Sequence, residues 1–180
     1  MAYSTTTPPT TGLAPTTYSY LDSPVGRLLL VGQPEALTGL FVADHDRCPP
    51  VRPEWTEDDE RFVDVSRQLG EYFAGTRTTF DVALHFAGTS FQVAVWSALR
   101  DIPYGTTMGY AELGRRVGKP TAARAVGAAN GRNPISIIVP CHRVIGADGS
   151  MTGYGWGTER KAWLLDHERG IQTMASGRPA

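Results

Sequence analysis

One cysteine of this chain lies where it could act as a nucleophile. In the stretch "IIVPCHRVIG", residues 137–146, Cys141 follows an apolar run and precedes His142 and Arg143. Pro140 cannot donate to a strand ladder, so we expect the sulfur to lie where a buried strand ends. A cysteine in this setting could serve in packing, in a disulfide, as a metal ligand or as a nucleophile.

The other residues of these types argue against a disulfide and a metal site. The second cysteine, Cys48, lies in the proline-rich stretch "DHDRCPPVRPEW" and receives no role here. A disulfide between the two is formally possible but unexpected in a chain of cytosolic character. The two cysteines and four histidines form no Cys-x-x-Cys motif and no paired-histidine cluster. We therefore expect no metal ligands.

A nucleophilic thiol needs help, because its ordinary pKa of about 8.5 leaves little thiolate at neutral pH. Neighbouring side chains of an extended segment point to opposite sides, so Cys141 and His142 need not touch and a water could link them. Glu168 shares a face of the last expected helix with Leu164 and Leu165. A carboxylate on a core-facing surface needs a partner, and we expect Glu168 to orient His142 and to favour its protonated form when the thiolate forms. The alternative is a solvated glutamate at a helix end.

The first half of the chain is expected to form a small antiparallel sheet with one helix. Three apolar, β-favouring runs, broken by "SPVG" and "GQPEA", predict a meander. Thr56 and Asp59 have the spacing of a capping box, and Gly75 is placed to end the helix that follows. The alternating stretch "FDVALHF" predicts a further strand with His85 facing solvent.

The second half is expected to be mainly helical. Thr89 and Gln92 have capping-box spacing before the amphipathic stretch "FQVAVWSALRDIP". The stretches "TTMGYAELGRRVGKP" and "TAARAVGAANGRNP" predict two short helices separated by "GKP", which is typical of a helix-turn-helix. A strand over "ISIIVPCHRVIG" and a final helix over "TERKAWLLDHERG" complete this half.

Together these elements predict an α/β chain of the α+β kind. We expect a Thr/Pro-rich disordered leader over residues 1–17, an N-terminal α/β domain over 18–88, a C-terminal helix-turn-helix domain over 89–170 and a flexible tail over 171–180. The N-terminus lacks the basic and apolar regions of a secretory signal, and no apolar run approaches the roughly 18 residues of a membrane span. We therefore expect a cytoplasmic protein without membrane contact.

The charge of the two halves differs in sign. Residues 1–88 carry 6 Lys and Arg against 12 Asp and Glu, whereas residues 89–170 carry 10 against 6. A basic second half favours contact with a polyanion, the alternative being uneven surface charge without a function.

The helix expected over "TAARAVGAANGRNP" has Arg124 as its one long side chain among alanines and glycines. Such a helix suits the narrow minor groove of DNA better than the major groove, unless its small residues serve close helix packing.

The residues around Cys141 resemble the active-site segment of the O6-alkylguanine-DNA alkyltransferases. The family's Pro-Cys-His-Arg-Val core is present from Pro140 to Val144, and "YAELGRRVG", "ARAVGAANGRNP" and "GYGWGTERKAWLL" match in order and spacing. The resemblance covers residues 89–169 strongly and the first half only in its expected shape. It implies a ribonuclease-H-like N-terminal domain followed by a winged-helix DNA-binding domain.

The resemblance also implies roles for the residues that carry the chemistry. Cys141 would accept the alkyl group, after His142 and a water deprotonate it, with Glu168 supporting His142. Asn133 would bridge the helix-turn-helix to the active-site loop. Tyr110 would donate a proton to the departing guanine oxygen. The product would be a thioether that nothing nearby can cleave, so each molecule would react once, without metal or organic cofactor.

The remaining implied residues concern DNA. Arg124 would fill the gap left by a flipped nucleotide, and Tyr154 would line the pocket for the extruded base. The other implied contacts to substrate or DNA are Thr121, Ala123, Gly127 and Val144. Trp156 replaces a glycine found in many relatives, and its indole at the pocket rim should disfavour bulky adducts such as benzyl.

The resemblance thus implies direct-reversal repair of O6-alkylguanine, and of O4-alkylthymine without a ranking between them. The partner would be double-stranded DNA, bound in the minor groove independently of sequence by a monomer, with cooperative binding left open.

Other function classes fit parts of the sequence. A lesion sensor of this family would lack the cysteine, which this chain retains. A Cys-His hydrolase would need an oxyanion hole. It would also give no reason for a helix of small residues with Arg124 as its one long side chain. A fused regulatory protein would need a further zinc-binding module with several cysteines.

Overall fold

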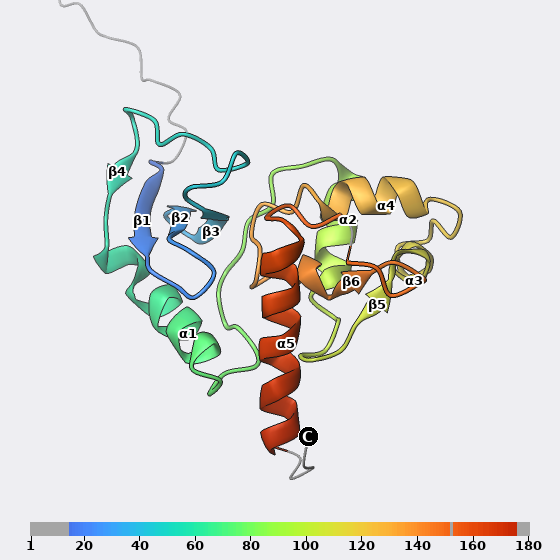
Figure 1. Ribbon diagram of the computed structural model, residues 1–180. Helices are drawn as coiled ribbons and strands as arrows, with labels where there is room; N and C mark the ends of the chain where they lie inside the picture. Colours follow the sequence, from blue (N-terminus) through green and yellow to red (C-terminus); the bar gives the residue numbers. More distant parts are fainter. Residues whose placement is uncertain (1–14, 152, 176–180) are drawn as a thin grey trace, which may run out of the picture.

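The structure is a computed structural model that describes residues 15–151 and 153–175. A small sheet with one helix forms the N-terminal half, and a group of helices forms the C-terminal half (Figure 1). The long last helix, α5 (Thr158–Ala175), runs between the two. The chain is therefore of the mixed α/β class predicted from its sequence.

The N-terminal sheet contains the predicted antiparallel meander. Its strands are β1 (Thr17–Leu21), β2 (Leu28–Gln33) and β3 (Ala36–Val42). A short strand that the sequence did not predict, β4 (Thr56–Glu57), pairs in parallel with β1, and the order across the sheet is β3-β2-β1-β4. Thr17 already pairs within β1, so the expected leader over residues 1–17 is too long; residues 1–14 lie outside the described part.

The predicted capping box at Thr56 is wrong. Thr56 is a strand residue, and the Asp59 carboxylate accepts a hydrogen bond from Ser19 Oγ at 2.6 Å. The side chain that was expected to cap the helix instead ties the helix start to the sheet. The helix begins later, as a 3-10 turn, η1 (Glu60–Phe62), that leads into α1 (Val63–Phe73). Gly75, with φ of +78°, follows its end as predicted.

The stretch "FDVALHF" is extended but forms no regular strand. It makes one isolated bridge, in which Leu37 N–H donates to Ala83 O and His85 N–H donates to Leu37 O, both at 2.9 Å. The predicted alternation holds, since its large apolar side chains are half-buried and His85 is exposed.

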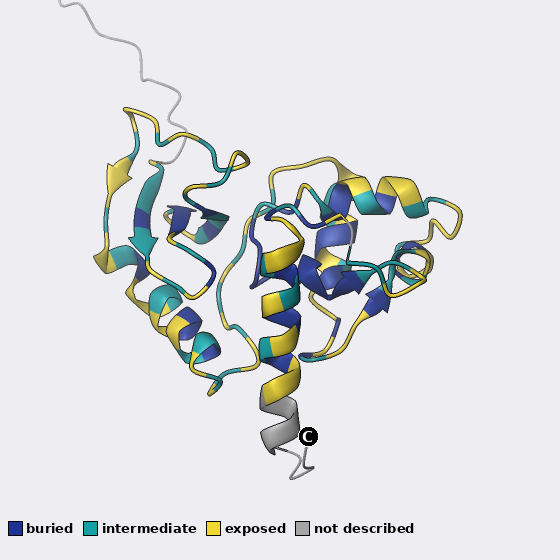
Figure 2. Cartoon of the chain, in the orientation of Figure 1, coloured by how far each residue is buried: buried dark blue, intermediate teal, exposed yellow. Residues whose placement is uncertain are grey.

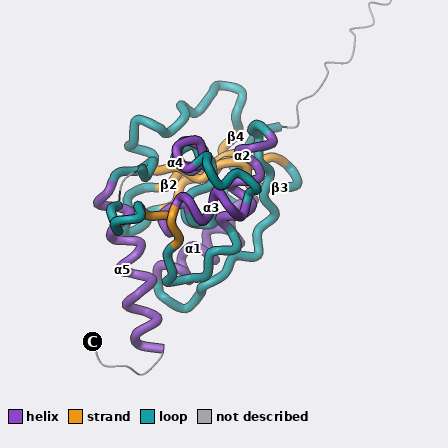
Figure 3. The backbone as a smooth tube through the Cα atoms, turned by 90° about the vertical axis from the view of Figure 1, so that its right-hand side faces the viewer, coloured by secondary structure: helices purple, strands orange, loops and turns teal. Residues whose placement is uncertain are grey.

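The C-terminal half contains the predicted helices. The Thr89–Gln92 capping box is present and begins α2 (Ser90–Leu99). The next two helices, α3 (Tyr110–Arg116) and α4 (Ala123–Asn130), pack against each other across a tight turn. A Cβ atom on Gly114 of α3 would lie 2.9 Å from the Lys119 carbonyl, so the turn can approach α3 this closely only at a glycine. Figure 3, which views the molecule from this half, shows α3 and α4 lying in front of the sheet.

One hydrophobic core joins the two halves. Buried residues of β2, α1, α2, α4 and α5 belong to a single cluster, and the buried faces point inward in both halves (Figure 2). Trp96 Nε1 donates to the Ala129 carbonyl at 2.9 Å and holds α4 against α2. The backbone of α5 continues to Ala175, beyond the expected end at Gly170 and into the expected tail; residues 176–180 lie outside the described part. No described helix is long and apolar enough to span a membrane.

Candidate active site

Cys141 lies in a tightly folded loop, not at the end of the predicted strand. Cys141 begins a 3-10 turn, η2 (Cys141–Arg143), which leads into the two-residue strand β6 (Val144–Ile145) beside β5 (Met108–Gly109). Ile137 has φ of +71°, a left-handed conformation that is rare for a β-branched residue and interrupts any strand. Apolar periodicity alone does not distinguish such a buried loop from a strand.

Two side chains of this loop contact the Cys141 sulfur. Asn133 Nδ2 donates to Sγ at 3.0 Å and also to the Val139 carbonyl at 2.7 Å, while Ser136 Oγ lies 3.6 Å from Sγ. Burial raises the pKa of the Cys141 thiol; these hydrogen bonds and the charge of Lys161 oppose the rise without cancelling it. The sulfur thus rests as a thiol and needs a base to react at neutral pH.

Glu168 is the centre of a buried hydrogen-bond network. His142 Nε2 lies 2.8 Å from Glu168 Oε1, the pairing expected from the cost of burying an unpaired carboxylate. Arg143 contacts both carboxylate oxygens at 2.9 Å, and Tyr72 Oη and the Gly105 N–H each donate to the carboxylate at 2.9 Å. Burial would raise the pKa of the Glu168 carboxyl, but hydrogen bonds and charge from His142 and Arg143 outweigh it and hold the pKa well below its usual range. The carboxylate is therefore ionised.

In the resting structure the His142 imidazole is neutral. Burial lowers the pKa of the imidazole below its ordinary value, and Glu168 opposes this shift without reversing it. A neutral ring donates from Nε2 to the ionised Glu168, which leaves Nδ1 as an acceptor. Among the described residues Nδ1 has no hydrogen-bond partner, and His142 makes no direct hydrogen bond to the Cys141 sulfur. His142 is thus a neutral base held in the required tautomer.

Two buried cations of the site were missed in the sequence. Arg143 also donates to the Ile102 carbonyl at 2.6 Å, and Lys161 Nζ donates to the Val144 carbonyl at 2.5 Å. Burial lowers the pKa of Lys161, although the nearby Cys141 opposes this. Lys161 precedes Glu168 by seven residues on the same helix face, so helical spacing could have found it. Arg143 was visible as part of the Pro140–Val144 core and within an apolar stretch, but neither signal gave it a role.

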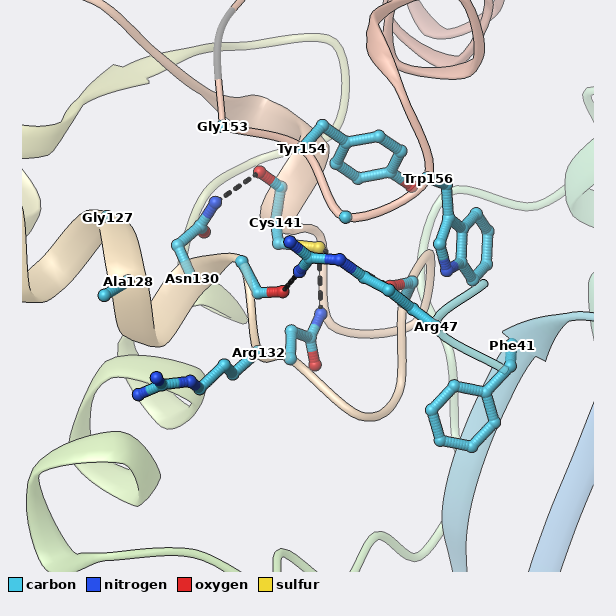
Figure 4. A pocket seen from close by; sticks show the side chains of 14 residues that line it. Phe41, Arg47, Gly127, Ala128, Asn130, Arg132, Cys141, Gly153, Tyr154 and Trp156 are labelled. Carbon is cyan, nitrogen blue, oxygen red and sulfur yellow. Dashed lines mark hydrogen bonds between the residues drawn. The ribbon is translucent and has the colours of Figure 1, made fainter. Parts of the chain in front are cut away.

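A pocket of about 640 Å³ reaches the Cys141 sulfur (Figure 4). Five of the predicted residues line it: Gly127, Asn133, Cys141, Tyr154 and Trp156. The sequence did not single out the other side chains that reach it, which are Phe41, Arg47, Ala128, Asn130, Arg132 and Ser136. The indole of Trp156 is buried in the wall, its ring centre 5.9 Å from that of Tyr154, and does not stand at the rim as expected.

Other predicted residues lie outside the pocket wall. Tyr110 lies between α4 and the loop that precedes α5, since a Cβ atom would be 3.7 Å from its ring if built on Gly127 and 2.8 Å from its hydroxyl if built on Gly153. Arg124 is exposed on α4, Thr121 is exposed just before it, and Ala123 at its start is half-buried.

The last of the predicted substrate contacts, Val144, does not line this pocket. Its side chain is fully buried in the core, because the 3-10 turn ends there and the chain enters β6.

Comparison with known proteins gives one consistent family. Residues 16–86 match the "ribonuclease-like domain" and residues 90–170 the "DNA binding domain" of 6-O-methylguanine DNA methyltransferase. A methylated-DNA–protein-cysteine methyltransferase of Mycolicibacterium paratuberculosis is 52% identical over 152 residues, which cover 84% of this chain and 92% of the relative. One from Methanosarcina acetivorans is 49% identical over 151 residues, 84% of this chain and 97% of the relative.

Solved structures agree with this result. The crystal structure of Mycobacterium tuberculosis O6-methylguanine methyltransferase has a TM-score of 0.81 and 51% identity, covering 87% of this chain and 94% of that chain. A structure of the Mycobacterium tuberculosis protein in complex with DNA also has a TM-score of 0.81, with 50% identity over 86% of this chain and 94% of that chain.

Proposed function

The chain belongs to the O6-alkylguanine-DNA alkyltransferase family, and on this premise we propose that it repairs alkylated DNA by transferring the alkyl group of O6-alkylguanine to Cys141. One observation carries the proposal. The Cys141 sulfur opens onto a pocket, accepts a hydrogen bond from Asn133, and adjoins a neutral His142 held by Glu168. This arrangement supplies a soft nucleophile together with its base.

The transfer begins with deprotonation of the thiol. The proton passes from Cys141 through a water to Nδ1 of His142, whose positive charge then pairs with the Glu168 carboxylate. The thiolate attacks the alkyl carbon; the S–C bond forms as the C–O bond breaks, and the electron pair leaves with the guanine oxygen. Tyr110 donates a proton to that oxygen. Burial and the nearby Cys141 raise the pKa of the Tyr110 hydroxyl, which keeps its proton at neutral pH.

The reaction requires the base to leave the duplex. A stacked base cannot reach the sulfur of a cysteine that is 2% exposed, so the nucleotide must be flipped into the pocket. The small residues of α4 allow close approach to the minor groove, and the exposed Arg124 fills the gap left in the stack. Binding through phosphates makes recognition independent of sequence. O4-alkylthymine presents an equivalent alkyl–oxygen bond and is a second substrate.

The product limits each molecule to one reaction. S-alkylcysteine is a thioether, and no adjacent group can remove its alkyl substituent. The test is repair of a duplex that carries one O6-methylguanine, with lesion in excess over protein. We expect restored guanine to stop at one per protein molecule, while 2-aminopurine placed beside the lesion reports flipping by its fluorescence.

The Cys141→Ser variant is the matched control: it should bind and flip without repair. Continued turnover by the parent would instead indicate a hydrolase. Tight lesion binding by the parent without repair would indicate a sensor.

A further inference from the structure

Arg47 belongs to the sheet-bearing half of the chain but lines the pocket of the helical half. It lies in a turn after β3, where its N–H donates to His45 Nδ1 at 3.1 Å and the Cys48 N–H donates to the His45 carbonyl at 2.7 Å. These bonds fix the turn from which the side chain departs. Figure 4 shows that side chain running across the pocket from the side of Phe41 and Trp156.

The Arg47 guanidinium lies between two backbone segments of the helical half. Its Nη1 donates to the carbonyl of Gly131, the residue that ends α4. A Cβ atom would lie 3.7 Å from Nη1 if built on Gly131 and 3.5 Å if built on Gly155. Both glycines line the pocket, and Arg47 is exposed. The guanidinium therefore spans the two walls at the open side of the pocket.

The hydrogen bond to Gly131 uses one of the Arg47 side-chain N–H donors and leaves the guanidinium charge without a counter-ion among the described residues. A guanidinium has a permanent charge and several N–H donors, whereas the Gly131 carbonyl is a single neutral acceptor. Asp44 and Asp46 belong to the same turn, yet within the described part of the chain neither forms an ion pair with Arg47. A cation that faces a pocket instead of its neighbouring carboxylates favours an anionic ligand.

The geometry of the substrate places such an anion at the pocket's open side. In guanine the alkylated oxygen is on the six-membered ring, and the bond to the sugar is on the opposite, five-membered ring. When the alkyl group faces the buried Cys141 sulfur, the sugar and its phosphates must therefore face outward. This is the side on which the Arg47 guanidinium lies.

We propose that Arg47 binds a phosphate that flanks the flipped nucleotide, exchanging the Gly131 carbonyl for a charged, bidentate acceptor. This inference rests on the proposed function and adds a DNA contact from the N-terminal half of the chain. The alternative is a purely structural role, in which Arg47 stabilises the carbonyl end of α4. The two roles differ in one respect, because only the first depends on the charge of a particular phosphate.

A double-mutant cycle between protein and DNA tests the proposal. Binding is measured on the full chain carrying Cys141→Ser, with and without Arg47→Gln. The duplexes contain O6-methylguanine and either natural phosphates or a neutral methylphosphonate immediately 5′ or 3′ of the lesion. On the natural duplex we expect Arg47→Gln to weaken binding about tenfold. It should also reduce the slope of log affinity against log salt by about 0.9.

The coupling decides the outcome. Methylphosphonate at one flanking position should weaken binding by the chain that retains Arg47 and leave the Arg47→Gln chain unchanged. Arg47→Lys should recover part of the affinity, since the charge remains without the fork geometry. Arg67→Gln removes the same charge from α1, where Arg67 pairs with Asp64 and Glu71, and should stay within about twofold of the parent.

Additive effects of Arg47→Gln and both methylphosphonates would overturn the proposal. The proposal would also be overturned if Arg47→Gln slowed methyl transfer from free O6-methylguanine base as much as transfer from the duplex. The free base has no phosphate, so an equal loss would indicate a structural role. Methyl transfer to Cys141 in the parent tests the proposed function separately. Transfer without coupling removes only the Arg47 contact, whereas coupling without transfer leaves a lesion-binding protein.

Discussion

Arg143 donates a hydrogen bond to each carboxylate oxygen of Glu168, from Nε and Nη2 at 2.9 Å each, and His142 contacts the same carboxylate at 2.8 Å. Glu168 is fully buried and would be costly there without a permanent cation. The base of the reaction therefore depends on an arginine that touches neither the sulfur nor, in the proposed reaction, the substrate. Arg143 is a positioning residue.

We predict that Arg143→Met lowers the free energy of unfolding by about 3–5 kcal/mol, because it leaves a buried carboxylate with an uncompensated charge. Chemical denaturation measures this change. The exposed pair of Arg116 with Glu112 provides the control, since Arg116→Met should cost less than about 1 kcal/mol. Adding Glu168→Gln to Arg143→Met should recover part of the loss. Equal losses for Arg143→Met and Arg116→Met would contradict the role given to Arg143.

The free energy of unfolding should fall as the pH drops below about 6.5, and fall more steeply below about 4.3. The pKa of His142 is lower in the folded than in the unfolded chain. At a pH between its folded and unfolded pKa, His142 is therefore protonated in the unfolded chain only, and the unfolded chain is favoured as the pH falls. The folded pKa of Glu168 is also depressed; its stabilisation is complete above the unfolded pKa and is lost as the pH falls toward the folded one. Urea denaturation at a series of pH values measures the slope.

The Glu168→Gln variant should show a shallower loss of stability at acid pH than the parent. Glu35→Gln serves as its control, because Glu35 is an exposed carboxylate in the turn between β2 and β3. The same acid slope in the parent and in Glu168→Gln would exclude Glu168 as its source.

Ser136→Ala should slow alkyl transfer near neutral pH by about threefold to tenfold, because it removes a hydroxyl 3.6 Å from the sulfur that helps to lower the pKa of Cys141. The loss should shrink at high pH, because the variant shifts the pKa of Cys141 further upward. Single-turnover rates across pH measure this shift, and Ser136→Thr, which keeps a hydroxyl, should retain most of the rate. A uniform loss at every pH would point to packing instead.

Trp156→Gly should raise the rate with O6-benzylguanine relative to O6-methylguanine. The indole occupies the pocket wall beside Tyr154, where a benzyl group would need space. The ratio of the two transfer rates is the measurement, taken below the melting temperature because loss of a buried indole costs about 3–5 kcal/mol. Equal rates for the two substrates in the parent chain would remove this explanation.

Local spacing in the sequence predicted much of the fold and part of the site. The three apolar runs that form β1 to β3, the Thr89–Gln92 capping box and the shared face of Leu164 and Glu168 all concern residues close together in the chain. The partner of Glu168 followed from the cost of burying a charge. Such inferences hold because one element's periodicity determines which side chains share a face.

The missed features depend on contacts between distant segments. Arg47 meets Gly131 across 84 positions of the chain, and no local pattern signals that contact. The loop before Cys141 was misjudged as a strand because the positive φ of Ile137 is set by tertiary contacts and leaves no trace in apolar periodicity. The resting charge of His142 could not be predicted either, because it depends on how far burial outweighs the charge of Glu168.

The central claim is that Cys141 receives the alkyl group irreversibly. Intact-protein mass spectrometry after incubation with a duplex carrying one O6-methylguanine, followed by peptide mapping, tests it most directly. We predict one added CH2 unit per protein, located on Cys141, with Cys48 unmodified as the internal control. Tight lesion binding without a mass change, or a methyl group on any other residue, would contradict the account.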